Sequence, residues 1–212
     1  MTSRSRPIAD MSGRPLGSRA LMKRRLLLDA TKKLLEESSL RDLRVADIAR
    51  AVSTSPATFY QYFGDVEDAV LHLAAEANEE MPALLQLFDG SWRGKEGLRR
   101  AREIVLFFIQ YWDTYGAVLR VRNLAADEGD ARFMELRRLA MEPVLAAMVA
   151  QMEVNTTAKK NSGIKPLPAA FAMSSILDRL AAYHHMVESA GVTREDLVDT
   201  SAQILFRTLT VK

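Results

Sequence analysis

The chain has 212 residues, of which 48% are hydrophobic, so it can bury the core of one large domain or of two small ones. It contains no run of 18 consecutive apolar residues, which argues against a membrane span, and its N-terminus lacks the apolar segment of a secretory signal. The absence of cysteine excludes disulfides and thiolate metal sites and fits a cytoplasmic protein.

The formal net charge of +2 is unevenly distributed along the chain. Residues 1–64 carry twelve Lys and Arg against six Asp and Glu, a formal charge of +6, whereas the remainder has a formal charge of −4. A basic N-terminal part favours a polyanionic partner such as nucleic acid, although basic segments also serve solubility alone. Residues 1–18 combine arginine with Ser, Gly and Pro and lack apolar periodicity, which predicts a flexible basic arm.

Helical patterns begin at Arg19. Leu27, Ala30 and Leu34 fall on one face of a predicted helix, which "EESSLRDL" ends. Two short helical segments follow, "RVADIARAV" and "SPATFYQYF", separated by a short turn. Ser55 is suited to cap the second segment and Pro56 to occupy its first helical position, so this pair predicts a helix-turn-helix.

The remaining residues continue the helical pattern. Helices are predicted over 66–88, 95–115, 117–127, 131–154 (interrupted by Pro143), 168–189 and 194–210. Gly191 and Thr193 provide the C-cap and N-cap between the last two, and "NTTAKKNSGIKPLP" is a predicted surface loop. Alternation typical of strands is not found, so the predicted fold is all-α with about nine helices.

The segment after Ser55 combines core and surface side chains. Phe59 and Phe63 are spaced i, i+4 and are predicted core anchors, so Thr58, Gln61 and Tyr62 would project from the other side. Gln makes bidentate contacts with adenine, Thr contacts the thymine methyl group, and Tyr hydroxyls bind phosphate. These residues predict insertion into a DNA major groove, with the alternative that the tyrosines are boundary packing residues.

Residues 22–71 resemble the DNA-binding domain of TetR-family transcriptional regulators. The resemblance is carried by "RLLLDATKKLL" (25–35), "VADIARA" (45–51), Ser55 and "TFYQYF" (58–63), the last especially similar to the ethionamide-resistance type of repressor. The chain departs from the family pattern at Ser53, where Gly is common, at Arg44, where a Ser or Thr cap is common, and at Val66, where Lys is common. A Ser at the turn adopts the required conformation at a modest cost.

The resemblance implies three regions: the flexible arm 1–18, a helix-turn-helix DNA-binding domain 19–65, and a ligand-binding and dimerisation domain 66–212. A homodimer would bind double-stranded palindromic operator DNA, usually as a repressor. The helix that begins near Val66 would transmit movement between the DNA-binding domain, residues 19–65 (the reader), and the ligand cavity. The predicted DNA-binding residues are Ser55, Pro56, Ala57, Thr58, Tyr60, Gln61, Tyr62, Arg19, Arg24 and Arg44. Arm residues Arg4, Arg6 and Arg14 are further candidates for the minor groove.

The resemblance also implies a cavity for a small hydrophobic effector and an interface made by the last two helices. Large apolar residues are core by default, but aromatic and Met side chains also suit an apolar ligand. The predicted ligand-binding residues are Phe107, Phe108, Tyr111, Trp112, Tyr115, Met148, Ser174, Asp178 and Tyr183. The predicted dimer residues are Leu177, Leu180, His184, Leu197, Ile204 and Leu205.

Other functions find little support in the sequence. Motifs for nucleotide-binding loops, nucleophile elbows and zinc proteases are missing, so neither an enzyme nor a cofactor is expected. His184 and His185 are adjacent on a predicted helix and should diverge by about 100°, so no metal site is expected either. The remaining alternative is a helical adaptor whose basic arm binds RNA or a membrane, but the arm lacks the interleaved apolar residues of membrane-binding segments.

Overall fold

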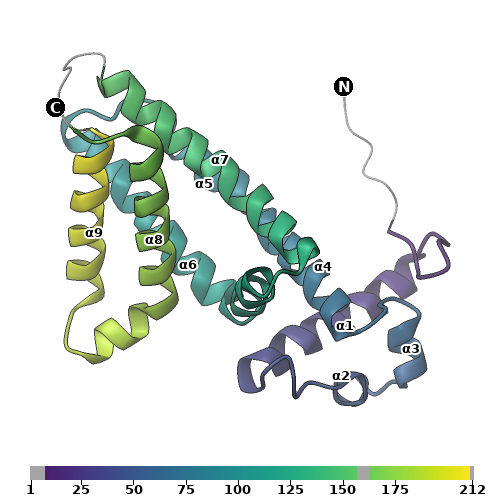
Figure 1. The fold of residues 1–212 in the computed structure, drawn as a ribbon. Helices are drawn as coiled ribbons and strands as arrows, with labels where there is room; N and C mark the ends of the chain where they lie inside the picture. Colours follow the sequence, from purple (N-terminus) through teal and green to yellow (C-terminus); the bar gives the residue numbers. More distant parts are fainter. Residues whose placement is uncertain (1–7, 157–162, 211–212) are drawn as a thin grey trace. The chain divides into compact units, whose positions relative to one another are not determined.

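The computed structural model describes residues 8–156 and 163–210, with the side chains of 155 and 156 excepted. These residues form nine α-helices and no strand (Figure 1), which confirms the all-α prediction. In chain order the helices are α1 (Ser18–Glu37), α2 (Val45–Ala51), α3 (Pro56–Tyr60), α4 (Val66–Asn78), α5 (Met81–Gln86), α6 (Gly94–Asp127), α7 (Ala131–Thr156), α8 (Pro166–Ser189) and α9 (Arg194–Leu209).

Two helix boundaries differ from the prediction, and the predicted interruption at Pro143 is wrong, because this residue lies inside the continuous helix α7. The single helix predicted over 66–88 is divided into α4 and α5, and α5 carries a proline in its first turn. Proline lacks an N–H and clashes with the preceding turn, so it begins a helix rather than continuing one. Conversely, the helices predicted over 95–115 and 117–127 are one helix, α6. Gly116 is buried inside it, and a single glycine costs a helix only about 1 kcal/mol.

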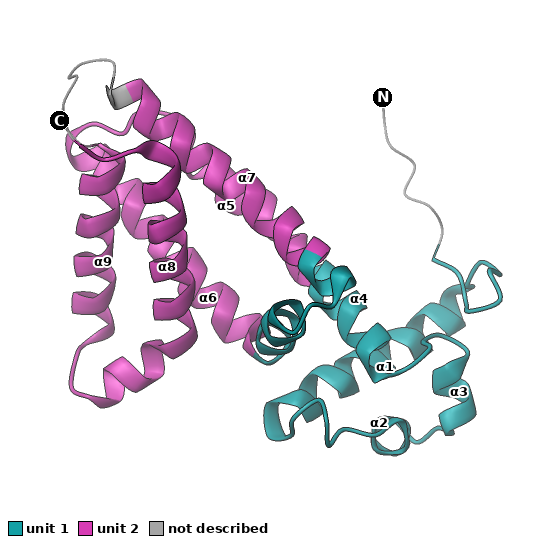
Figure 2. Ribbon diagram, in the orientation of Figure 1, with its two compact units in different colours: residues 1–76, 117–134 teal, residues 77–116, 135–212 magenta. Residues whose placement is uncertain are grey.

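The chain forms two compact units (Figure 2). Unit 1 comprises the residues up to Glu76 together with Ala117–Met134, and unit 2 comprises Ala77–Gly116 together with Glu135–Lys212. Unit 1 therefore extends beyond the predicted reader, residues 19–65, because it also includes most of α4 and parts of α6 and α7. Among the helices of the described residues, none is both long and apolar enough to cross a membrane.

The core of unit 1 holds the helix-turn-helix together. α1 packs against α2, and α2 packs against α3. Phe59 and Phe63 are fully buried, with ring centroids 5.2 Å apart, as their spacing predicts. The fully buried side chains around them are Leu27, Leu28, Ile48, Ala49, Ala69 and Val70.

The turn and cap before α3 have the predicted geometry. Ser53 adopts a φ of 51°, a left-handed conformation that glycine favours and that serine adopts at some cost. Ser55 has an extended backbone, and its hydroxyl accepts a hydrogen bond from the Thr58 N–H at 3.3 Å. Pro56 follows at the start of α3, where its missing N–H leaves no hydrogen bond unmade.

Residues 8–17, the described part of the predicted flexible arm, form a hydrogen-bonded turn. The Asp10 carboxylate accepts hydrogen bonds from the N–H groups of Ser12 and Arg14, each at 2.9 Å, and closes a turn. The Met11 N–H donates to the Gln61 carbonyl at 3.0 Å, so this turn is attached to the end of the reader. Of the predicted minor-groove arginines, Arg4 and Arg6 lie outside the described residues.

Unit 2 is built on the pair α8 and α9, which pack side by side (Figure 1). Gly191, with a φ of 93°, ends the connection after α8, and the Thr193 hydroxyl caps α9 by accepting from the Asp196 N–H at 3.1 Å. The N-cap prediction at Thr193 is confirmed, whereas the C-cap of α8 is Ala190 and Gly191 is the residue after it. At the start of α6, Gly97 allows close packing, because a Cβ there would lie 2.5 Å from Trp92 and 2.6 Å from the Phe206 ring.

We expect Phe63→Ala to lower the free energy of unfolding by about 3–5 kcal/mol, because it removes a fully buried ring from a packed core. The matched variant Tyr60→Ala truncates an aromatic ring that is 52% exposed and should cost about 1 kcal/mol or less. Urea denaturation followed by circular dichroism measures both. Equal losses for the two variants would show that Phe63 is not the anchor of α3.

Candidate nucleic-acid interface and ligand pocket

The first candidate site is the outer surface of α3 in unit 1. Ser55, Pro56, Ala57, Tyr60 and Gln61 are exposed, and Thr58 is half-buried. The Ser55 and Thr58 hydroxyls lie 3.2 Å apart, which makes a polar start to the helix. The Tyr60 ring is 52% exposed and packs edge-on against the buried Phe59 ring at 5.8 Å. Phe59 thereby supports Tyr60 from beneath, so the aromatic and amide side chains are presented to solvent together.

Two predicted DNA-binding residues lie elsewhere. Tyr62 is only 9% exposed and packs against Phe63, because it lies three positions after the buried Phe59 and so falls near the same face of the helical turn. Arg24 is 8% exposed, and its guanidinium lies 5.1 Å from the centroid of the Phe63 ring. Burial lowers the pKa of the Arg24 guanidinium from its usual value. Both side chains support α3 from within unit 1, which corrects their predicted role in direct contact with DNA.

Unit 1 carries exposed cations, one of them beside α3. Arg44 lines an open groove of about 600 Å³ together with Pro56 and Tyr60. Arg19 is also exposed, and neither it nor Arg44 forms an ion pair within the described residues. Other arginines of unit 1 are already paired: Arg25 with Asp29 and Glu76, Arg41 with Glu128, and Arg50 with Asp47. Arg19 and Arg44 are therefore the cations of this set most available to a phosphate.

A second candidate site lies in unit 2. Phe107, Tyr111 and Tyr115, three of the predicted ligand-binding residues, line a pocket of about 270 Å³. They occupy successive turns of α6, with ring centroids 6.1 and 5.5 Å apart along the series. The Tyr115 hydroxyl donates to the Glu80 carboxylate at 3.2 Å, so an acidic group closes one side. The pocket combines aromatic walls with a few polar groups, as small-molecule sites do.

Three lining residues were not predicted. Gln110 and Thr114 follow from the helical periodicity of the predicted aromatic residues, since they lie three positions after Phe107 and Tyr111. Glu80 comes from the segment between α4 and α5, and no local pattern connects it to α6.

The other predicted ligand-binding residues do not join this pocket. Phe108 and Met148 are buried in the core, and Ser174 is 7% exposed. The Trp112 indole N–H donates to Asp178 Oδ1 at 2.9 Å and so connects α6 to α8. Tyr183 is 41% exposed, and the Arg179 guanidinium lies 4.1 Å from its ring centroid. The predicted single set is therefore divided between a pocket, a core and a surface.

The predicted dimer residues are mostly covered by the chain itself. Leu177, His184 and Leu205 are at most 2% exposed, Leu197 is 8% exposed, and Leu180 is half-buried. These side chains pack inside unit 2, which corrects their assignment to a surface. Ile204 is 47% exposed and remains available to a partner. The exposed apolar residues of α8 are Leu167, Phe171, Ile176, Tyr183 and Met186.

Comparison with known protein families gives two matches. Residues 84–212 match the tetracyclin repressor-like C-terminal domain, and residues 27–77 match the tetR family of bacterial regulatory proteins. The second match covers α2, α3 and most of α1 and α4. None of the curated proteins compared with the chain is a match.

Solved structures share the fold over nearly the whole chain. A fatty acid degradation regulator, FadR, from Bacillus halodurans is 16% identical, with a TM-score of 0.66 over 91% of this chain and 97% of that one. FadR from Bacillus subtilis, solved in complex with stearoyl-CoA, is 16% identical with a TM-score of 0.55 over 89% and 99%. A TetR family transcriptional regulator from Chloroflexus aurantiacus is 16% identical with a TM-score of 0.58 over 92% and 88%.

At these low sequence identities the solved structures show a shared fold alone, whereas the family matches are made on the amino-acid sequence. The C-terminal family model alone covers more than half of the chain, and the N-terminal model covers the helix-turn-helix. The chain therefore belongs to the TetR family of bacterial transcriptional regulators.

Proposed function

We propose that this protein is a ligand-responsive repressor that binds palindromic operator DNA as a homodimer. The observation that carries the proposal is the exposed surface of α3, where Tyr60 and Gln61 stand over the buried Phe59 and Phe63. A helix that only completed a core would not present a capped, polar and aromatic surface beside unpaired cations. A repressor of this kind acts in the cytoplasm, where the chromosome lies.

We assign different tasks to the residues of this surface. Gln61 and Thr58 contact base edges in the major groove, because an amide pairs with adenine and a Thr methyl contacts thymine. The Tyr60 hydroxyl and the guanidinium groups of Arg44 and Arg19 bind phosphates, which fix the position of the protein without selecting a sequence. Arg24 and Tyr62 act indirectly, as the support of α3.

The effector in this proposal is a small, largely apolar molecule bound between Phe107, Tyr111 and Tyr115. The pocket volume of about 270 Å³ lies at the lower end of the range for ligand sites, so it accommodates a compact molecule or one part of a longer one. FadR from Bacillus subtilis was solved with stearoyl-CoA, which makes an acyl chain one candidate for such a part.

The coupling in this proposal follows continuous helices. α6 carries the pocket residues and continues past Gly116 into unit 1, and α4 passes from unit 1 into unit 2 after Glu76. A ligand that binds one arrangement of these helices more tightly shifts the population of readers able to bind DNA, by no more than its difference in affinity. Exposed apolar side chains of α8 and Ile204 of α9 supply the dimer contact.

We expect Gln61→Ala and Arg44→Ala to change DNA binding in different ways. Loss of the Gln61 amide should cost about 1–3 kcal/mol at one base position and relax the preference there. Loss of Arg44 should weaken binding to all sequences alike and reduce the salt slope by about 1. Selection from a randomised duplex library, followed by affinity measurements at several salt concentrations, separates these effects.

Arg41→Ala is the control for Arg44, because its exposed guanidinium is paired with Glu128 at 3.2 Å. It should leave both affinity and salt slope nearly unchanged. Identical behaviour of Gln61→Ala and Arg44→Ala across the library would contradict the roles assigned here. Binding without preference for any duplex would instead favour the adaptor with a basic arm.

We expect Thr114→Trp to weaken binding of an apolar probe to unit 2 at least about tenfold, because the indole would fill a pocket of about 270 Å³. Fluorescence titration with 1-anilinonaphthalene-8-sulfonate, and competition by stearoyl-CoA, measure this. Leu106→Trp is the matched control, since Leu106 is 40% exposed on the same helix and does not line the pocket. Equal probe affinities for the two variants would place the effector site elsewhere.

A further inference from the structure

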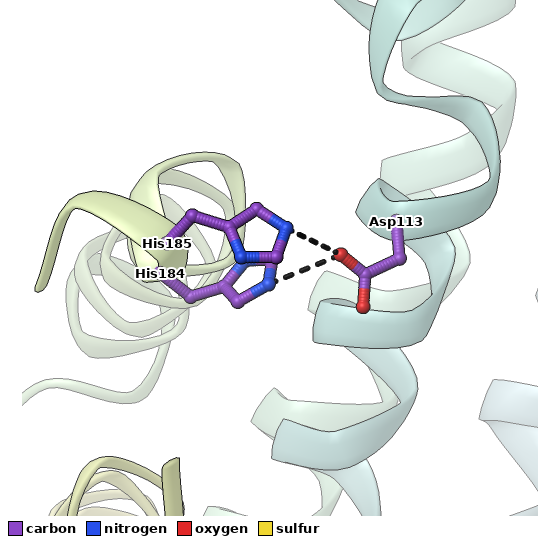
Figure 3. A group of neighbouring side chains, drawn as sticks. All are labelled: Asp113, His184 and His185. Atoms are coloured by element: carbon purple, nitrogen blue, oxygen red, sulfur yellow. Dashed lines mark ion pairs between the residues drawn. The ribbon is translucent and has the colours of Figure 1, made fainter. Parts of the chain in front are cut away.

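Asp113 of α6 and the adjacent His184 and His185 of α8 converge in unit 2 (Figure 3). Nε2 of His184 lies 3.0 Å and Nε2 of His185 lies 3.3 Å from the same oxygen, Asp113 Oδ1. The two imidazole centroids are only 3.9 Å apart. The prediction that the two adjacent side chains point in different directions is therefore wrong, because both imidazoles approach the same carboxylate oxygen.

The hydrogen bonding of His184 fixes which of its nitrogens faces Asp113. Nδ1 lies 2.8 Å from the Ala181 carbonyl oxygen, which only accepts, so Nδ1 carries a proton. In the neutral ring Nε2 then presents its lone pair. Nε2 is buried and makes no hydrogen bond with the described residues, although Asp113 Oδ1 lies 3.0 Å away. A lone pair and a carboxylate oxygen at this distance repel each other unless a proton or a metal ion lies between them.

His185 has the same orientation from a more exposed position. Its Nδ1 lies 3.7 Å from the Glu188 carboxylate, which leaves Nε2 directed at Asp113. Histidines that bind metals commonly direct the second ring nitrogen at a carbonyl or carboxylate, which fixes the tautomer and the ring orientation. His184 uses the Ala181 carbonyl for this purpose at 2.8 Å, and His185 directs Nδ1 toward the Glu188 carboxylate at the longer distance of 3.7 Å.

The spacing and chemistry of the three groups fit a transition-metal ion. Ligand atoms bound at about 2.0–2.1 Å in a tetrahedron lie about 3.3 Å from one another, close to the observed distances between the imidazole nitrogens and the carboxylate. Two imidazoles and one carboxylate favour Zn²⁺, Ni²⁺, Co²⁺ or Fe²⁺ over Mg²⁺ and Ca²⁺, which prefer oxygen ligands.

The surrounding charges permit a cation. Arg194 Nη1 lies 3.6 Å from Asp113 Oδ2, which opposes an ion, but Arg194 Nε also donates to Glu188 at 2.7 Å. The guanidinium thus faces one oxygen of Asp113 and leaves Oδ1 to the histidines. Asp113 and Glu188 together outweigh Arg194 by one negative charge, so a divalent ion would leave the cluster with a charge of about +1.

We propose that Asp113, His184 and His185 bind one divalent transition-metal ion, which joins α6 to α8. The site is separate from the apolar effector pocket and does not depend on the proposed function. Asp113 immediately precedes Thr114, a pocket-lining residue, and follows Trp112, which already bonds to Asp178 of α8. The ion would therefore hold the α6 wall of the pocket against α8.

The test is metal binding by the full-length, metal-free protein. Zn²⁺ or Ni²⁺ should bind once per chain in calorimetric titration and raise Tm, because a ligand of the native state stabilises it. Co²⁺ should give the visible absorption of a site with few ligands. His185→Ala and Asp113→Asn should each weaken binding by about 10–100-fold or more, the loss typical of removing even an outer partner of a metal ligand. Both residues are partly exposed, so these variants are expected to fold.

His72→Gln is the matched control, because it removes the remaining histidine, which packs against Phe63 in unit 1 and lies outside the cluster. Its metal affinity should equal that of the original protein. Two results would overturn the proposal: no binding and no rise in Tm at metal concentrations up to about 1 mM, or equal affinities for His185→Ala and His72→Gln. The first would mean that a proton, not an ion, lies between His184 and Asp113.

Discussion

The exposed surface of α3, the proposed DNA-binding surface, depends on the burial of Phe63. The helix above it, α3, has five residues, far fewer than a helix needs to persist alone in water. Its conformation is therefore imposed by packing: the Phe59 ring at 5.2 Å, the His72 ring at 5.6 Å and the Arg24 guanidinium at 5.1 Å surround Phe63. These contacts determine the position of each outward side chain of α3, and Arg24 takes part in them from within the core.

The parts of the reader that could be predicted are those set by neighbours in the sequence. The cap at Ser55 and the spacing of Phe59 and Phe63 follow from local backbone geometry, and the left-handed Ser53 follows from the resemblance to the family, in which Gly is common at this position. Tyr62 was misplaced because it lies three positions after the buried Phe59, a spacing that brings both rings near the same face of a helical turn. Arg24 was misplaced because the burial of a long, charged side chain depends on which ring lies beside it, and that ring is 39 positions away along the chain.

The wrong predictions in unit 2 have the same cause: burial depends on residues that are distant in the sequence. Periodicity predicts that Leu177 and Leu205 belong to apolar helix faces, but it does not say whether the chain or a partner covers them. Here the chain covers both. Likewise, Phe107, Tyr111 and Tyr115 were among the predicted ligand-binding residues, whereas Glu80, which completes the pocket, approaches from a separate segment. A helical pattern identifies a buried face, and only the tertiary packing identifies what buries it.

The contacts between α6 and α8 differ from the apolar packing around them. Apolar side chains tolerate small shifts between helices because their contacts are not directional, whereas a buried polar group loses its partner if the helices move. The Trp112–Asp178 hydrogen bond satisfies both of its groups, so it fixes one alignment of the two helices. The neighbouring approach of Asp113 to His184 is favourable only with a cation or proton between them. The Trp112–Asp178 hydrogen bond therefore stabilises the alignment of α6 and α8 by itself. The adjacent pair, Asp113 and His184, stabilises the same alignment only when a proton or a cation from solution lies between them.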